Sequence, residues 1–327
     1  MRAVGKWIGR GLLALIVIIG LLVAFGPYEA LHEDVGFDPG QLDGGVEAYL
    51  AAQEAAFEDI TPGVEKRVIW AGEAGAPTPL AMVYVHGFSA TSEEIRPVPD
   101  QLAAALGANL HFTRLSGHGR GGAAMAEPRV QDWMEDLAEA IAVGRAIGEE
   151  VVLVTTSTGG TFAALAALEP GLVEDVAGIA FVSPNFGINN PLAPLLTWPA
   201  ARHWIGAVGG AERAFEPQNE GHGTYWTTRY PTVSVLPMAA AVKHAAAQDY
   251  QGVSVPALFL FSDADGVVRP DITREIAAQW GGPVQIVNMD GGAGGDPYNH
   301  VIAGDILSPA GTAPAVEALR GWIEGLQ

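Results

Sequence analysis

One serine in a short polar stretch has the setting of a nucleophile. Residues 155–160 read TTSTGG and directly follow EVVLV, a run of apolar, β-branched residues. A serine between a buried strand and a helix lies on a sharp turn that exposes its hydroxyl above the sheet. Such a turn needs small residues two positions before and two positions after the serine. Gly159 meets this requirement and Thr155 does not. The stretch alone leaves Ser157 either a nucleophile or a capping hydroxyl at a helix N-terminus.

The partners that a nucleophilic serine needs are present elsewhere in the chain. It needs a base, a carboxylate that orients the base, and donors for the oxyanion formed on a carbonyl substrate. His300, in DPYNHVIAGD, is the candidate base, and Asp263 and Asp265, in LFLFSDADGVV, are the candidate carboxylates. The turn HGF can aim the backbone N–H of Phe88 toward the same strand ends, and the N–H of Thr158 is the second candidate donor.

These residues follow segments with the pattern of buried strands. Short apolar runs alternate with longer helical patterns, which predicts a mostly parallel, doubly wound α/β sheet covered on both faces. Sites in such sheets form at the carboxyl ends of the strands, where the candidate residues lie. The predicted strands are 66–72, 80–87, 109–115, 150–156, 178–184, 256–262 and 283–289. The predicted helices are 92–108, 130–148, 159–171 and 308–326.

One long stretch, residues 185–251, breaks this alternation. It has no clear strand and is rich in Pro, Trp and Tyr. Because a structureless loop of this length is unusual in a compact domain, we predict a helical cap insertion over the strand ends. Its aromatic residues are candidates for lining an apolar substrate pocket, or for forming the packing core of the insertion itself. The four candidates are Trp198, Trp204, Tyr225 and Trp226.

The amino terminus differs from the rest of the chain. No charged residue occurs from Gly11 to Phe25, three cations precede this run, and acidic residues follow it. The pattern predicts a membrane helix through residues 7–28 with the amino terminus in the cytoplasm. The rest of the chain is then extracytoplasmic, and periplasmic if the source is bacterial. A cleaved signal peptide, which would release a secreted protein, is the alternative, although no convincing small-x-small cleavage site follows.

Composition narrows the classes of function. The formal net charge of −20 argues against nucleic acid as a partner. The absence of cysteine excludes disulfides, thiolate metal sites and a cysteine nucleophile. The histidines have no metal-ligand spacing, so we expect neither a metal nor another cofactor.

Five motifs in a fixed order resemble one superfamily. They are HGF at 86–88, RLSGHGR at 114–120, TTSTGG at 155–160, SDADGVV at 262–268 and NHVIAGD at 299–305. Together they resemble the α/β-hydrolase superfamily over roughly residues 65 to 325. Within it, the chain is similar to bacterial carboxylesterases and monoacylglycerol-lipase-like enzymes, also known as serine-aminopeptidase-like hydrolases.

The resemblance implies a role for each motif. Ser157 matches the nucleophile and His300 the general base. Asp265 matches the orienting carboxylate better than Asp263, because the family pattern is Asp-x-Val-Val. His86 and His118 match structural positions of loops.

The implied activity is hydrolysis of a small-molecule acyl ester through an acyl-enzyme. The chain would then divide into an anchor or signal segment (1–28), a connector (29–60) and an α/β-hydrolase domain (61–327) that carries the cap insertion. Peptidase and acyltransferase activities on the same fold remain open, because function depends on the pocket. Glu212, Glu216 and Glu220 could bind a peptide amino terminus. A non-catalytic binding descendant, which Thr155 would favour, is the third possibility.

Overall fold

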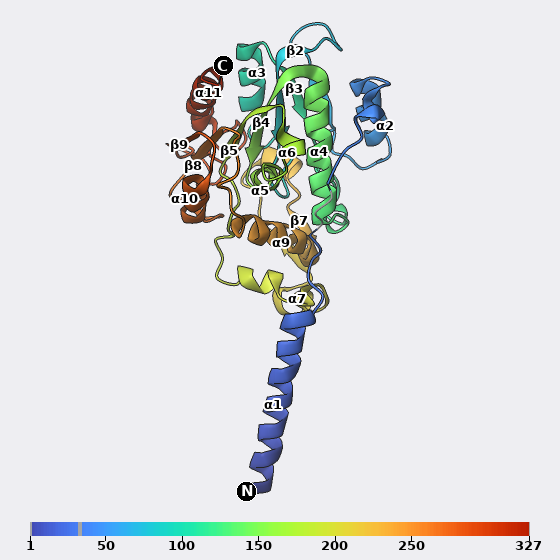
Figure 1. The fold of residues 1–327 in the computed structure, drawn as a ribbon, viewed down its shortest axis with the longest axis vertical. Helices are drawn as coiled ribbons and strands as arrows, with labels where there is room; N and C mark the ends of the chain where they lie inside the picture. Colours follow the sequence, from blue (N-terminus) through green and yellow to red (C-terminus); the bar gives the residue numbers. More distant parts are fainter. Residues whose placement is uncertain (1, 32–34, 327) are drawn as a thin grey trace.

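A seven-stranded sheet forms the centre of the computed structural model, which describes residues 2–31 and 35–326 (Figure 1). The strand order is β1-β3-β2-β4-β5-β8-β9. Neighbouring strands are parallel except β1 and β3, which are antiparallel. All seven predicted strands are present: β1 Arg67–Ile69, β2 Thr78–Val85, β3 Asn109–Phe112, β4 Gly148–Thr156, β5 Val176–Val182, β8 Ala257–Phe261 and β9 Val284–Asn288.

Helices cover both faces of this sheet, as the continuous apolar strands require. Along β4, Val151 and Leu153 face one hydrophobic core, while Val152 and Val154 face the other, and all four are fully buried. The first core also contains side chains of α4 (Val130–Ile147), α5 (Thr158–Ala166) and α10 (Pro270–Gln279). The second contains those of α3 (Val98–Leu106) and α11 (Pro309–Glu324). The prediction of a doubly wound α/β sheet is confirmed; α10 was not predicted.

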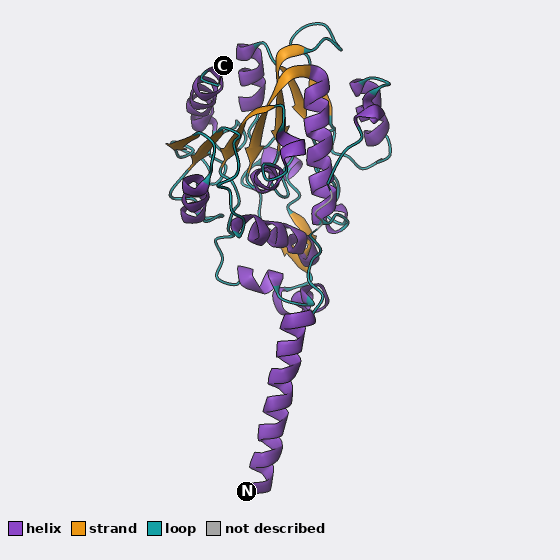
Figure 2. Cartoon of the chain, in the orientation of Figure 1, coloured by secondary structure: helices purple, strands orange, loops and turns teal. Residues whose placement is uncertain are grey.

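The cap insertion is not purely helical, so the prediction that it lacks strands is wrong. β6 (Glu212–Ala214) and β7 (Arg229–Pro231) pair in antiparallel fashion, apart from the main sheet (Figure 2). The three residues of β6 are exposed, so no apolar alternation marked this strand in the sequence. The remaining elements are η3 Ala193–Thr197, α7 Ala201–Gly209, α8 Glu220–Tyr225, η4 Thr232–Ser234 and α9 Val235–Ala246.

The amino-terminal segment forms one helix, α1 (Arg2–Phe25), that projects away from the sheet (Figure 1). Residues 6–25 of this helix are long and apolar enough to cross a membrane, and none of them is buried against the rest of the protein. A signal sequence would have the same properties. The segment that follows contains η1 (Pro39–Leu42) and α2 (Val46–Glu54), and the short helix α6 (Pro170–Val173) follows α5.

Candidate active site

Ser157 lies at the sharp turn between β4 and α5. Its backbone has φ +50° and ψ −116°, a conformation that L-residues rarely adopt. The turn brings α5 against the end of β2, because a Cβ at Gly159 would lie 2.5 Å from the carbonyl oxygen of Val85. The requirement for a small residue two positions after the serine is therefore a steric one.

A chain of hydrogen bonds joins Ser157 to two residues that are far away in sequence. The Nε2 of His300 lies 3.0 Å from the Oγ of Ser157, and its Nδ1 lies 2.8 Å from the Oδ2 of Asp265. All three residues are buried. Burial would lower the pKa of His300, but the Asp265 carboxylate and its hydrogen bond outweigh this effect and raise it above the ordinary value.

The two aspartates near the end of β8 have different environments. The Oδ1 of Asp265 accepts hydrogen bonds from the backbone N–H groups of Val267 and Val268, at 2.8 and 2.9 Å, and these fix the carboxylate toward His300. Asp263 is exposed and forms an ion pair with Arg274 at 2.7 Å, and this hydrogen bond lowers its pKa. The structure thus brings Asp265, and not Asp263, to His300.

A further carboxylate, Asp296, fixes the loop that carries His300. Its Oδ2 accepts the backbone N–H groups of His300 and Val301, each at 3.1 Å, and its Oδ1 accepts the amide of Gln218 at 3.0 Å. Sequence reasoning missed this residue. Asp296 could have been predicted from its place in a loop, four residues before the candidate histidine, because aspartate commonly accepts backbone N–H groups in turns.

The loop after β2 holds one of the two candidate oxyanion donors, the backbone N–H of Phe88. The N–H of Leu115 donates to the Nε2 of His86 at 3.1 Å, so the proton of this imidazole is on Nδ1, which lies 2.8 Å from the carbonyl oxygen of Gly87. Burial lowers the pKa of His86 well below its usual value, which keeps the ring neutral. In a trans peptide the C=O and the next N–H point in opposite directions. The N–H of Phe88 therefore points away from His86.

Glu94 supports the same loop from its other side. Its Oε2 accepts the N–H of Gly87 at 2.6 Å, and the hydroxyl of Tyr84 lies 3.4 Å away. A Cβ at Gly87 would lie 2.8 Å from the Oε1 of Glu94 and 3.0 Å from the Cβ of Ser157. No side chain therefore fits at position 87 between Glu94 and Ser157. Burial raises the pKa of Glu94 to about 7. Glu94 was not among the site residues predicted from the sequence.

Thr155 has a local structural explanation. It lies in the sheet interior, paired with Val85 on one side and Phe181 on the other, and is fully buried. Its hydroxyl donates to the carbonyl oxygen of Ala180 at 3.0 Å. A Cβ at Gly160 would lie 3.4 Å from this hydroxyl, so the side chain occupies the space beneath α5 that the sequence left unexplained.

Ser157 and His300 open onto a cavity of about 700 Å³. Phe88 and Thr158, the two oxyanion candidates, also line it. Most of the other walls are aliphatic or aromatic and come from the cap insertion, among them Leu192, Leu195, Leu196, Ile205, Val208, Phe215, Tyr230, Val235 and Met238. The cavity has the size and lining of a site for a small apolar ligand.

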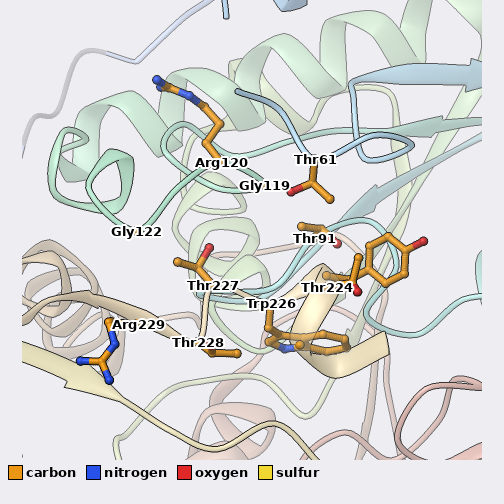
Figure 3. Close-up of a pocket in the computed structure, with 12 residues that line it drawn as sticks. Thr61, Thr91, Gly119, Arg120, Gly122, Thr224, Trp226, Thr227, Thr228 and Arg229 are labelled. Carbon is orange, nitrogen blue, oxygen red and sulfur yellow. The ribbon is translucent and has the colours of Figure 1, made fainter. Parts of the chain in front are cut away.

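One of the four aromatic residues predicted to line the substrate pocket lines this cavity, and the other three lie elsewhere. Trp226 lines the cavity. Trp198 lines a different pocket, and Trp204 packs against a small cluster within the cap insertion, with its indole N–H donating to the Pro199 carbonyl at 3.0 Å. Tyr225 lines a polar pocket of about 260 Å³ that shares Trp226 with the cavity. Figure 3 shows this pocket with Trp226 at its wall. The aliphatic side chains of η3 and α7, which the sequence analysis did not name, take the places assigned to the other three aromatics.

Comparison with known proteins identifies the family. The sequence model of the serine aminopeptidase family, S33, matches residues 77–292, about two thirds of the chain. The chain belongs to this family. The matched region of this family member includes Ser157 and Asp265 but ends before His300, so the place of His300 rests on the structure.

Lipases and esterases are among the proteins similar to this family member. It is 25% identical over 193 residues to the thermostable monoacylglycerol lipase of Bacillus sp. (strain H-257), an alignment that covers 59% of this chain and 73% of that lipase. A structure from the work on the metagenome-derived lipolytic enzymes LipS and LipT is 20% identical, with a TM-score of 0.65 over 81% of this chain and 99% of that one. The monoacylglycerol lipase of Paleococcus ferrophilus is 16% identical, with a TM-score of 0.56 over 80% and 100%. These structures support the α/β-hydrolase fold.

The first prediction concerns Asp265 and pH. His300 must be neutral to accept a proton, so activity should fall as the pH drops through its raised pKa, above about 6.5. Asp265→Asn should lower kcat/KM by about 10⁴-fold and move this acidic limb to lower pH, because the stabilising charge is lost. Asp263→Asn is the matched control and should change neither. Equal effects of the two variants in a pH–rate profile would contradict the role of Asp265 as the carboxylate that orients His300.

The second prediction concerns Thr155. Thr155→Gly should keep kcat/KM within a few-fold, because the side chain faces Ala180 and not the cavity. It should lower the free energy of unfolding by about 2 kcal/mol, through the lost hydrogen bond and the flexible residue placed in a strand. Thr155→Val, which puts a methyl group in place of the hydroxyl, should lower the free energy of unfolding by less. Denaturant unfolding measures the stability of both variants, and ester hydrolysis measures their kcat/KM. A stable Thr155→Gly variant without activity would reveal a catalytic role for the residue.

Proposed function

We propose that this protein is a serine hydrolase that cleaves carboxylic esters, of the carboxylesterase or monoacylglycerol-lipase kind. The observation that carries the proposal is the hydrogen-bonded chain Ser157–His300–Asp265 at the wall of a largely apolar cavity. The similarity to a bacterial monoacylglycerol lipase supports it. We expect no metal or other cofactor, since nucleophile, base and oxyanion donors are all supplied by the chain.

Acylation would begin with transfer of the Ser157 proton to the Nε2 of His300 as Oγ attacks the ester carbonyl carbon. The backbone N–H groups of Phe88 and Thr158 would stabilise the resulting oxyanion, and Asp265 would stabilise the imidazolium. When the tetrahedral intermediate collapses, the bond from the carbonyl carbon to the alcohol oxygen breaks. His300 returns its proton to this oxygen, and the alcohol leaves an acyl group on Ser157.

Deacylation would repeat these steps with water. His300 accepts a proton from the water molecule as its oxygen attacks the acyl carbon, and the same two N–H groups stabilise the second oxyanion. Collapse of this intermediate breaks the bond to the Ser157 oxygen, which recovers its proton from His300. The products are a carboxylic acid and an alcohol, and the enzyme is restored.

The lining of the cavity favours an apolar acyl group over a peptide amino terminus. An aminopeptidase would hold the substrate ammonium with carboxylates. Of the three candidate glutamates, only Glu216 lines the cavity. The other two carboxylates in the cavity wall outside the Ser157–His300–Asp265 chain, Glu94 and Asp296, already accept backbone N–H groups. The aliphatic side chains of η3 and α7 instead suit a hydrocarbon chain. A non-catalytic binding role would not require the hydrogen bonds from Ser157 to His300 and Asp265.

We further propose that α1 is an uncleaved membrane anchor and that the catalytic domain is extracytoplasmic. The cations of α1, Arg2, Lys6 and Arg10, all precede its uncharged run, residues 11–25, and this asymmetry supports the orientation. The alternative of a cleaved signal sequence would give a secreted enzyme with the same site. A reporter fused after residue 60 would distinguish the side of the membrane.

The third prediction tests the nucleophile. The full-length protein in detergent should hydrolyse short p-nitrophenyl esters, and a fluorophosphonate probe should label it covalently. Ser157→Ala should abolish labelling and lower kcat/KM by at least about 10⁴-fold, while the circular dichroism spectrum stays unchanged. Ser116→Ala, which lies outside the cavity, is the control. Full labelling or activity in a folded Ser157→Ala variant would overturn the proposal.

A further inference from the structure

The end of α1 is fixed to the cap insertion. Immediately after the helix, Gly26 lies against Pro199, because a Cβ at Gly26 would be 2.5 Å from the Cβ of Pro199. The carbonyl oxygen of Pro27 accepts the N–H of Ala200 at 2.7 Å. Two residues further on, Glu29 accepts two hydrogen bonds from the guanidinium of Arg202, at 2.7 and 2.8 Å.

These contacts fix the height of the cap insertion above the membrane. They all occur within four residues of Phe25, the last residue of α1, and four residues of extended chain span at most about 14 Å. If residues 6–25 span the membrane, the cap surface that begins at Trp198 lies at the membrane interface. Figure 1 shows α7 at the end of α1, with the sheet on the far side of the cap insertion.

The cap insertion also exposes large apolar side chains. Among the described residues outside α1, Val208 and Leu192 are the most exposed of this kind, at 70% and 66%. Trp198 is 51% exposed and Phe215 is 36% exposed. Exposed apolar side chains that gather on one surface commonly mark an interaction site. A bilayer is the occupant that continuity with α1 favours.

The exposed apolar residues are also continuous with the cavity that holds Ser157. Leu192, Val208 and Phe215 line this cavity, together with Ser157 and His300. The cavity therefore extends from the nucleophile to the apolar surface of the cap insertion. A ligand that leaves the bilayer near α1 would meet the apolar walls of the cavity without crossing water.

The charge around the end of α1 complements an anionic lipid surface. A second cavity of about 630 Å³ lies between residues 27–31, α7 and α9. Among the described residues, Arg129, Arg202 and Lys243 line it, together with one carboxylate, Glu29, which lies within ion-pair distance of both arginines. Cations that lie near a membrane surface attract anionic headgroups. This concentration of cations contrasts with the net charge of −20 of the whole chain.

We propose that the anchor holds the cap insertion flat on the bilayer, so that the mouth of the catalytic cavity opens into the leaflet and receives single-chain lipid esters from it. This inference rests on the proposed membrane anchor and deepens the proposed esterase function. The occupant of the apolar cap surface is the lipid of the membrane that holds α1. Arg202 is a positioning residue in this arrangement, since it contacts Glu29 of the segment after α1 and does not line the catalytic cavity.

A depth measurement tests the docking without any assay of activity. Because the chain has no cysteine, Val208→Cys gives a single site for an environment-sensitive NBD label on the full-length protein. In vesicles of phosphatidylcholine and phosphatidylglycerol, nitroxide-labelled phosphatidylcholine should quench this label. The control is Ile286→Cys on β9, which is 41% exposed and lies outside the cap insertion. Quenching at 208 that is no stronger than at 286 would overturn the docking, whatever the enzyme hydrolyses.

A kinetic comparison tests the route of the substrate. Arg202→Ala should lower the hydrolysis of 1-monooleoylglycerol embedded in vesicles by about tenfold relative to that of soluble p-nitrophenyl acetate, because the mouth is no longer held on the leaflet. Arg229→Ala removes a cap arginine that pairs with Glu212 and not with the anchor segment, and should leave the ratio unchanged. An unchanged ratio in Arg202→Ala would contradict delivery from the leaflet. If the wild type hydrolyses neither substrate, the proposed esterase function is refuted. The docking of the cap insertion, which is measured by quenching, is not affected by that result.

A second, independent inference concerns Glu94. Its carboxylate is buried, holds the Gly87 N–H at 2.6 Å and lies against the glycine that separates it from Ser157. We infer that Glu94 is a positioning residue: it fixes the peptide between His86 and Gly87, and so helps to orient the next peptide, whose Phe88 N–H points at the oxyanion. His86 holds the carbonyl of the same glycine, so the two side chains together fix both polar groups of Gly87. This inference rests on the proposed serine-hydrolase mechanism.

The test is a comparison of three variants. Glu94→Ala should lower kcat for a p-nitrophenyl ester by about 10- to 100-fold with little change in KM, because misaligned donors affect the transition state most. Glu94→Gln keeps an acceptor for the Gly87 N–H and should restore most of kcat. Glu94→Asp keeps the carboxylate on a shorter side chain, and its kcat should lie between those of the other two variants. It replaces Glu94→Ala in the comparison if the alanine variant fails to fold. Equal kcat in all folded variants, or equal losses in Gln and Ala, would overturn the role.

Discussion

The contact between the start of α5 and the end of β2 is the constraint on which the site depends. With only 2.5 Å between a Cβ at position 159 and the Val85 carbonyl, no side chain fits there, and the helix can begin immediately above the sheet. The chain must then turn within one residue, which puts Ser157 at φ +50°. Such strain costs about 1–3 kcal/mol. It is offset by the hydrogen bonds that the backbone of Ser157 makes with Val182 and Asn185, at 3.0 and 2.9 Å.

Around this turn, buried polar groups hold one another in place. Asp265 accepts two backbone N–H groups in addition to its contact with His300, and Asp296 accepts two more from the loop that carries His300. Buried carboxylates are tolerated only where such donors replace water. The same donors prevent the side chains from reorienting during a reaction. Preorganised dipoles of this kind are the largest contribution to many catalysed reactions, so the stability of the loops and the proposed chemistry share one set of contacts.

The cap insertion links this site to the amino-terminal helix. It provides the apolar walls of the cavity on its inner side and the contacts to residues 26–29 on its outer side. In the proposed membrane arrangement, this segment carries the orientation of the helix to the mouth of the cavity. The main sheet contributes little to this geometry. Its role is to present Ser157, His300 and Asp265 at the carboxyl ends of its strands, as in other open α/β sheets.

The sequence by itself determined the strands, the covered sheet and the order of serine, aspartate and histidine, because apolar runs and strand-end residues are local patterns. It also identified Gly159 as a steric requirement. It did not reveal β6 and β7, since each has only three residues and only Tyr230 among them is buried, so neither strand carries an apolar alternation. It could not place the cavity walls, because aliphatic residues of η3 and α7 look the same in sequence whether they face a core or a ligand.

The family pattern favoured Asp265 over Asp263, but both follow the same strand, and only the tertiary structure shows which of them lies beside His300. The N–H groups of Val267 and Val268 hold the Asp265 carboxylate there. The tertiary structure also revealed Glu94 and Asp296, whose roles come from backbone groups that are near them in space. These choices depend on distances between loops, and such distances exist only once the sheet has brought the strand ends together.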